Sequence, residues 1–68
     1  MVQVDARGLQ CPEPVMLTLD AIKNNPDDVI EVTVSNPIPC DNVARMAGKR
    51  GKNVEIKESG SDFILTLT

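Results

Sequence analysis

The chain has 68 residues and a net charge of −3, with 41% apolar and 25% charged residues. This composition suits one small globular domain over residues 1–68 and shows no disordered segment. Phe63 is the sole aromatic residue and acidic residues outnumber basic ones, so the sequence lacks both the stacking surface and the positive charge that nucleic-acid binding requires.

The first half of the chain predicts a strand, a helix and a second strand. In residues 2–7 apolar and polar side chains alternate, as in a strand with one buried face, and Gly8 ends the pattern. Residues 12–24 repeat apolar side chains at helical spacing until Asn24-Asn25-Pro26 stops the run. The apolar stripe of this helix is Val15, Leu19 and Ile22, widened by Met16. Residues 29–35 are rich in β-branched side chains and predict the second strand.

The second half predicts a short helix and a hairpin. Asp41 is the expected N-cap of the helix and Gly51 its C-terminal glycine, while Val43, Met46 and Ala47 are its apolar positions. Residues 54–57 and 63–68 alternate as two strands around a turn at Ser59-Gly60. The order β-α-β-α-β-β predicts an α/β two-layer sandwich, in which a mixed four-stranded sheet carries both helices on one face.

The reactive groups available to this chain are few. The N-terminus lacks the basic start and apolar run of a signal peptide, and no apolar stretch is long enough for a membrane span, so we expect a cytoplasmic protein. Two cysteines are too few for a disulfide framework, and the absence of histidine excludes a Cys/His zinc site and a histidine general base. We therefore expect no metal and no cofactor, and chemistry based on thiols or carboxylates.

Cys11 is the leading functional candidate. Pro12 suits the first position of a helix, which makes Cys11 the predicted N-cap, held extended with its side chain toward solvent. The unpaired N–H groups of the first turn and the positive end of the helix dipole then favour a thiolate. A free cysteine is often a small buried residue. Between a turn at Gly8 and the two prolines Pro12 and Pro14, however, it is poorly placed for core packing.

Two segments, Asp5-Ala6-Arg7-Gly8-Leu9 and Cys11-Pro12-Glu13-Pro14-Val15, together resemble the signature of the TusA/SirA/YedF family of small sulfur-carrier proteins, and the likeness covers nearly the whole chain. The resemblance implies that Cys11 accepts sulfane sulfur as a persulfide from a donor such as a cysteine desulfurase. The sulfur then passes to an acceptor protein, so the chain is not a stand-alone catalyst of small-molecule turnover. Asn36, Asn42 and Arg45 resemble the YedF branch, often linked to selenium metabolism, more than the tRNA-thiolation branch.

The turn around Cys11 is expected to support its thiolate through Arg7, Gly8, Pro12, Glu13 and Pro14. Arg7 is close in sequence and able to steady a thiolate or persulfide, whereas Asp5 either joins the site or only braces the turn. A thiolate of lowered pKa accepts sulfur readily and, once persulfidated, is a good leaving group. No other catalytic residue is strictly required.

Several interpretations of Cys40 are open. Parallel strands would bring its loop and that of Cys11 to the same edge of the sheet, and a helix start after Pro37 and Pro39 would favour its thiolate as well. Cys40 then either resolves a Cys11 persulfide, forms a reversible disulfide with Cys11, or is simply a small loop residue. The last is preferred, because two cysteines in a cytosolic chain are not by themselves evidence of a pair.

Arg45, Lys49 and Arg50 form a basic group with Lys52 on and just after the second predicted helix. They are either a docking patch for an acidic partner protein or a solvated face whose cations complement the helix C-terminus. Three functions therefore compete: a sulfur carrier, a dithiol redox module using Cys11 and Cys40, and a non-enzymatic regulatory interaction domain. The lack of a Cys-x-x-Cys spacing counts against the redox module.

Overall fold

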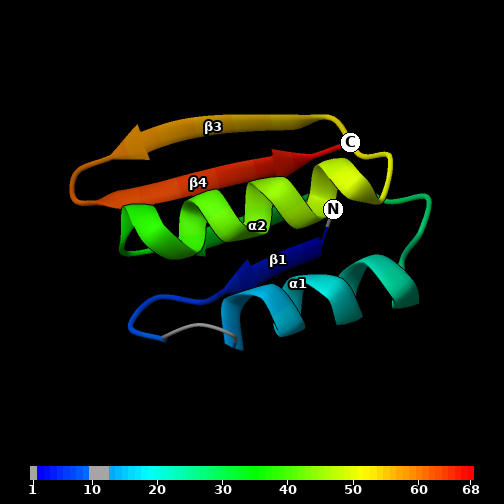
Figure 1. Ribbon diagram of the computed structural model, residues 1–68, viewed down its shortest axis with the longest axis horizontal. Helices are drawn as coiled ribbons and strands as arrows, with labels where there is room; N and C mark the ends of the chain where they lie inside the picture. The colour runs from blue at the N-terminus through cyan, green and yellow to red at the C-terminus, as the bar shows by residue number, and fades with distance from the viewer. Residues whose placement is uncertain (1, 10–12) are drawn as a thin grey trace.

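The computed structural model describes residues 2–9 and 13–68. The elements in this part of the chain are β1 (Val2–Asp5), α1 (Glu13–Asn24), β2 (Ile30–Val34), α2 (Pro37–Lys49), β3 (Val54–Ser59) and β4 (Asp62–Leu67). Their order is the predicted β-α-β-α-β-β, and Figure 1 shows both helices on one face of the sheet. No helix in these residues is long and apolar enough to cross a membrane.

The sheet is mixed and has the strand order β1-β2-β4-β3. β1 and β2 run parallel, with Val4 opposite Val32, whereas β4 pairs antiparallel with β2 and with β3. The hairpin between β3 and β4 turns at Gly60-Ser61, where Gly60 has φ 61°, as a two-residue turn with glycine first requires. The more apolar strand of the hairpin occupies the centre: Leu65 of β4 is fully buried, while Ile56 of the edge strand β3 is 50% exposed.

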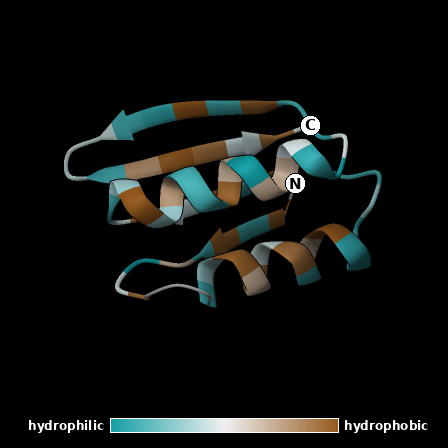
Figure 2. Cartoon of the chain, viewed as in Figure 1, coloured by the Kyte–Doolittle hydropathy of each residue, from teal (hydrophilic) through white to brown (hydrophobic). Residues whose placement is uncertain are grey.

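The core lies between the sheet and the two helices, and its apolar side chains alternate with outward polar ones along the strands. Figure 2 shows this alternation of apolar and polar residues along β1 and β3. The buried cluster consists of Ala6, Ala21, Ile22, Ile30, Val32, Val34, Cys40, Val43, Ala47, Leu65 and Leu67. Figure 1 shows that no helix of the described residues covers the opposite face of the sheet. Gln3 and Asp5, the outward side chains of β1, are exposed.

Helix α2 begins earlier than the sequence pattern predicts. Pro37 opens the helix after the extended residue Asn36 (φ −140°, ψ 150°), whose carbonyl oxygen accepts a hydrogen bond from the Cys40 N–H at 3.3 Å. Asp41 lies inside the helix, so the expectation that it is the N-cap is wrong. Pro37 and Pro39 both fit the first turn, because the N–H groups there have no partner within the helix.

The end of α2 is as predicted, with Gly51 just beyond the C-cap at φ 80°. The Gly51 N–H donates to the Gly48 carbonyl at 3.1 Å, and the Lys52 N–H donates to the Ala47 carbonyl at 3.0 Å. This pair of hydrogen bonds is a Schellman motif, which needs a left-handed residue at the position of Gly51.

The buried face of helix α1 is rotated from the predicted stripe, which it shares at Ile22, while Val15 is only partly buried against the core. Its buried positions are Pro14, Thr18, Ala21 and Ile22. Met16 is 58% exposed, so the prediction that it widens the buried stripe is wrong. Thr18 takes a core position because its hydroxyl donates a hydrogen bond of 2.8 Å to the Pro14 carbonyl, which satisfies the polar group without water.

Candidate functional site

The segment that leads toward Cys11 leaves the sheet where β1 and β2 both end. Because these strands are parallel, their carboxyl ends lie at the same edge, as predicted. The Ala6 N–H donates to the Thr33 carbonyl at 2.8 Å and extends the pairing by one residue beyond β1. Gly8 then turns the chain at φ 76°, and its N–H donates a hydrogen bond of 3.0 Å to Ser35 Oγ. The segment is therefore attached to the end of β2.

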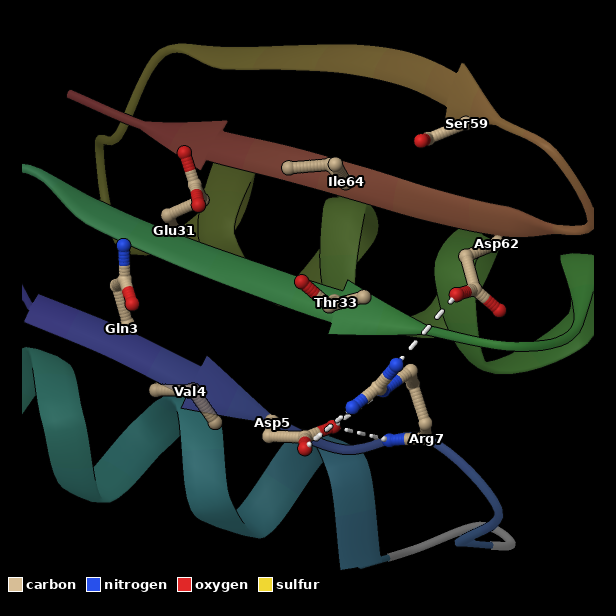
Figure 3. A pocket seen from close by; sticks show the side chains of 9 residues that line it. All are labelled: Gln3, Val4, Asp5, Arg7, Glu31, Thr33, Ser59, Asp62 and Ile64. Carbon is tan, nitrogen blue, oxygen red and sulfur yellow. Dashed lines mark hydrogen bonds and ion pairs between the residues drawn. The ribbon is translucent and has the colours of Figure 1, made fainter.

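Asp5 and Arg7 clamp the start of this segment on the open face of the sheet (Figure 3). Asp5 Oδ1 accepts hydrogen bonds from the backbone N–H of Arg7 at 3.2 Å and from its Nε at 2.9 Å, and Oδ2 accepts one from Nη2 at 3.0 Å. Arg7 Nη1 also lies 3.9 Å from Asp62 Oδ2, at the start of β4. Asp5 was expected either to join the site or to brace the turn. Its contacts with Arg7 support the second of these roles.

Asp5 and Arg7 shift each other's pKa. The hydrogen bonds from the Arg7 side chain lower the pKa of Asp5, and the hydrogen bond to the Asp5 carboxylate raises the pKa of Arg7. Both groups are therefore charged at neutral pH. The Arg7 guanidinium is engaged by carboxylates. Its expected role beside the Cys11 thiolate stays a prediction, because Cys11 lies outside the described residues.

On the far side of Cys11, α1 begins with Glu13 and Pro14. Glu13 is exposed, and its negative charge in the first turn complements the helix dipole. Pro14 is fully buried and packs under the first turn. The predicted turn residue Pro14 is thus a core residue that anchors the start of α1. Gln10, Cys11 and Pro12 lie outside the described residues, so the N-cap position of Cys11 stays a prediction.

Cys40 is a buried helical residue rather than a loop residue. It lies in the N-terminal part of α2, is 5% exposed and belongs to the core cluster. Burial raises the pKa of the Cys40 thiol, and the neighbouring negative charge of Asp41 adds to this effect. The expectation that the helix start favours its thiolate is wrong, because burial and the charge of Asp41 both favour the protonated thiol.

The basic residues of α2 do not gather at the cysteine edge. Arg45, Lys49 and Arg50 are all exposed, but the helix starts at that edge and runs away from it. With a rise of about 1.5 Å per residue, Lys49 lies roughly 18 Å along the helix from Pro37. Arg45 is the nearest of the three to the edge. Lys49 is in the last turn, where a cation complements the helix dipole.

A depression of about 460 Å³ opens on the helix-free face of the sheet, beside the Arg7 clamp (Figure 3). Asp5, Arg7 and Asp62 themselves line it, together with further outward residues of β1, β2 and β4 such as Thr33 and Ile64. Among the described residues, no group of three or more acidic or cysteine side chains is placed to hold a metal ion. The polar lining is open to solvent and adds no reactive group to the site.

Two residues of this site were missed by the sequence analysis. Ser35 directly follows β2, and a hydroxyl at the carboxyl end of a parallel strand was an available signal, although choosing its partner requires the β1–β2 register. Asp62 reaches Arg7 only because β4 lies beside β2. The strand order was not predicted, so the sequence held no usable signal for Asp62.

Comparisons with known proteins agree with this arrangement. A family model described as sulfurtransferase TusA matches residues 2–68. Among solved structures, the chain is similar to a SirA-like protein from Desulfitobacterium hafniense, with a TM-score of 0.91 and 28% identity over 98% of this chain and 95% of that one. A search of curated proteins gave no match. The resemblance carried by residues 5–9 and 11–15 is confirmed, and the chain belongs to the TusA family of sulfurtransferases.

Proposed function

We propose that this protein is a sulfur carrier that accepts sulfane sulfur on Cys11 and passes it to an acceptor protein. The observation that carries the proposal is the match of the sulfurtransferase TusA model over residues 2–68, a range that includes Cys11. The donor is a protein such as a cysteine desulfurase. The exchange requires a reduced thiol, which the cytoplasm maintains.

The proposed transfer is a thiol exchange. The Cys11 thiolate attacks the outer sulfur of the donor's persulfide, a new S–S bond forms at Cys11, and the donor's own S–S bond breaks so that its cysteine leaves as a thiolate. One sulfur moves and no electrons are gained or lost overall, so no oxidant is needed. The second transfer repeats this exchange with an acceptor thiolate as the attacking group.

The anchors on both sides of residues 10–12 support this role. Gly8 is attached to Ser35, and Pro14 is fixed in the core. A thiol on a short segment between two fixed points can be presented to a partner protein without large rearrangement. In this proposal Arg7 acts mainly by holding the segment through Asp5, because its guanidinium is occupied by carboxylates.

The dithiol alternative has less support. A resolving thiol must be accessible and readily deprotonated. Cys40 is 5% exposed and its pKa is raised by burial, so it lacks both properties. We therefore propose that Cys40 serves core packing.

Mass spectrometry after incubation with a cysteine desulfurase and cysteine tests the proposal. The protein is expected to gain the mass of one sulfur atom, located on Cys11 and removed by a reducing agent. Cys40→Ala is the matched control and should load normally, whereas Cys11→Ser should not load. Equal loading of the wild type and Cys11→Ser would contradict the proposal.

Arg45 is the best placed of the basic residues for partner docking, and we propose that it contacts an acidic surface of the donor. Arg45→Glu should slow sulfur loading at low salt, and the difference should shrink as salt screens the charges. Lys57→Glu is the control, because this exposed lysine lies on β3 and points to the helix-free face of the sheet. An equal effect of both substitutions would contradict a specific contact at Arg45 and would mean that it acts only through the net charge of the protein.

A further inference from the structure

We propose that Ser35 is a positioning residue for Cys11. It acts through Gly8, and the inference rests on the proposed function only in taking Cys11 as the reactive thiol. Ser35 lies directly after β2, is half-buried and accepts the Gly8 N–H at 3.0 Å. Gly8 precedes Cys11 by three residues. The hydroxyl thus links the cysteine segment to a strand at the centre of the sheet.

The backbone at Gly8 gives this hydrogen bond its importance. The pairing of β1 with β2 continues as far as the bond from the Ala6 N–H to the Thr33 carbonyl, and beyond it the chain leaves the sheet. Gly8 then takes a left-handed conformation with φ 76°, which sets the direction of the next residues. Without the acceptor, this N–H would bond to water, and the turn would lose its link to Ser35.

The neighbouring contacts of the segment act on other residues. Asp5 holds Arg7 by side-chain and backbone hydrogen bonds, and the Leu9 N–H makes a long bond of 3.4 Å to the Ala6 carbonyl within the same turn. Among the described residues that follow Ala6, the hydrogen bond to Ser35 is the one that ties this turn to the end of β2. Replacement of Ser35 should therefore alter the segment while the β1–β2 pairing persists.

Alkylation of Cys11 by iodoacetamide at pH 7 measures the positioning directly and needs no sulfur donor. The rate of alkylation follows the share of thiolate. Ser35→Ala is expected to slow alkylation by about two- to ten-fold, because a segment that is no longer held would take Cys11 away from its predicted N-cap position, where the helix dipole favours the thiolate. Ser35→Thr retains the hydroxyl and should restore a rate close to that of the wild type. Ser59→Ala is the matched control, because this exposed serine makes no hydrogen bond through its side chain within the described residues.

Hydrogen exchange at the Gly8 amide provides a second measurement, and its results for the unaltered protein and for Ser35→Thr do not depend on how well Ser35→Ala folds. In the unaltered protein this amide should exchange more slowly than in an unstructured peptide, and Ser35→Ala should remove the protection while Ser35→Thr keeps it. Exchange at the peptide rate in the unaltered protein would overturn the inference. So would Cys11 alkylation at the wild-type rate in a folded Ser35→Ala variant, or a folded Ser35→Thr variant that fails to restore the rate.

Sulfur loading separates this inference from the proposed function. If the wild type fails to load sulfur but Ser35→Ala slows alkylation, the proposed function is wrong and the positioning role of Ser35 stands. If the wild type loads and Ser35→Ala loads and alkylates equally well, the positioning role is wrong and the sulfur carrier stands. If both hold, Ser35→Ala should lower kcat for loading and leave KM nearly unchanged, because the donor surface is intact.

Discussion

Asp5 holds Arg7 through three hydrogen bonds, of 3.2 Å to its backbone N–H, 2.9 Å to its Nε and 3.0 Å to its Nη2. One carboxylate thus fixes both the backbone and the side chain of a residue two positions further along. The bonds join the last residue of β1 to the segment that leads to Cys11. The contribution of these hydrogen bonds to stability depends on the charge of Asp5, and it therefore depends on pH.

Asp5→Asn should lower the free energy of unfolding slightly at pH 7. The hydrogen bonds from Arg7 lower the pKa of folded Asp5 below its ordinary value of 3.8, so the folded state binds this proton more weakly than the unfolded state. The stabilisation is therefore present above pH 3.8 and lost as the pH falls through the lowered pKa. Urea unfolding of both proteins at several pH values measures the difference. The effect should be small, because the Asp5 and Arg7 side chains are 64% and 56% exposed.

Asp20→Asn is the control for this pH dependence. Asp20 is an exposed residue of α1 that forms no ion pair within the described residues. The free energy of unfolding of Asp20→Asn should change with pH in the same way as that of the wild type. A gap between Asp5→Asn and the wild type that stays constant down to pH values well below 3.8 would show that the Asp5–Arg7 contact adds no pH-dependent stability.

Cys40 should resist alkylation in the folded protein. The thiol is buried and its pKa is raised, so at pH 8 it should remain unmodified while Cys11 reacts, and it should react once urea unfolds the chain. Peptide mass spectrometry distinguishes the two cysteines. Equal modification of both in the native state would argue against the burial of Cys40.

The same raised pKa predicts how stability changes at high pH. Folded Cys40 holds its proton more tightly than the unfolded chain does, so its contribution is fully present below the ordinary pKa of 9.0 and is lost as the pH rises through the raised value. The free energy of unfolding of Cys40→Ala should not show this part of the decrease at high pH. A parallel decline in both proteins would contradict the prediction.

The sequence predicted those features that depend on local pattern. The β-branched alternation of residues 29–35 located β2 and its buried face, and Gly51 located the end of α2. The start of α2 precedes the predicted Asp41 cap, because Pro37 and Pro39 fit a first helical turn. Thr18 carried no apolar signal, since its burial depends on a hydrogen bond to Pro14.

The contacts of the candidate site depend on register and strand order, which periodicity does not contain. Ser35 meets Gly8 because Asp5 is paired with Thr33, so that the residues after both strands come together. Asp62 approaches Arg7 because the hairpin inserts β4 next to β2. Cys40 was placed near a helix start, but its burial follows from which face of α2 meets the sheet.

Two glycines of α2 should respond in opposite ways to alanine. Gly48 lies inside the helix with open space around its Cα, so Gly48→Ala should raise stability by about 0.5–1 kcal/mol. Gly51 has φ 80° in the Schellman motif, so Gly51→Ala should cost about 1–2 kcal/mol. Urea unfolding measures both changes, and each variant controls for the other. Changes of the same sign would contradict the assigned helix end.

Leu65 and Ile56 form a matched pair for testing where the core ends. They are directly paired across β4 and β3, yet Leu65 is fully buried and Ile56 is 50% exposed. Leu65→Ala should cost about 2–5 kcal/mol, the usual range for a fully buried leucine. Since the core of a domain below about 70–80 residues rarely supplies more than about 3–5 kcal/mol, this variant should be only marginally folded at 37 °C.

Ile56→Ala should cost well under half as much, because about half of the side chain already contacts water and its removal leaves little cavity. Urea unfolding at 25 °C, where both variants retain folded protein, gives the comparison. Similar losses for the two variants would mean that a further part of the protein or a partner covers β3 in solution. The predicted difference therefore also tests whether β3 is a free edge of the sheet.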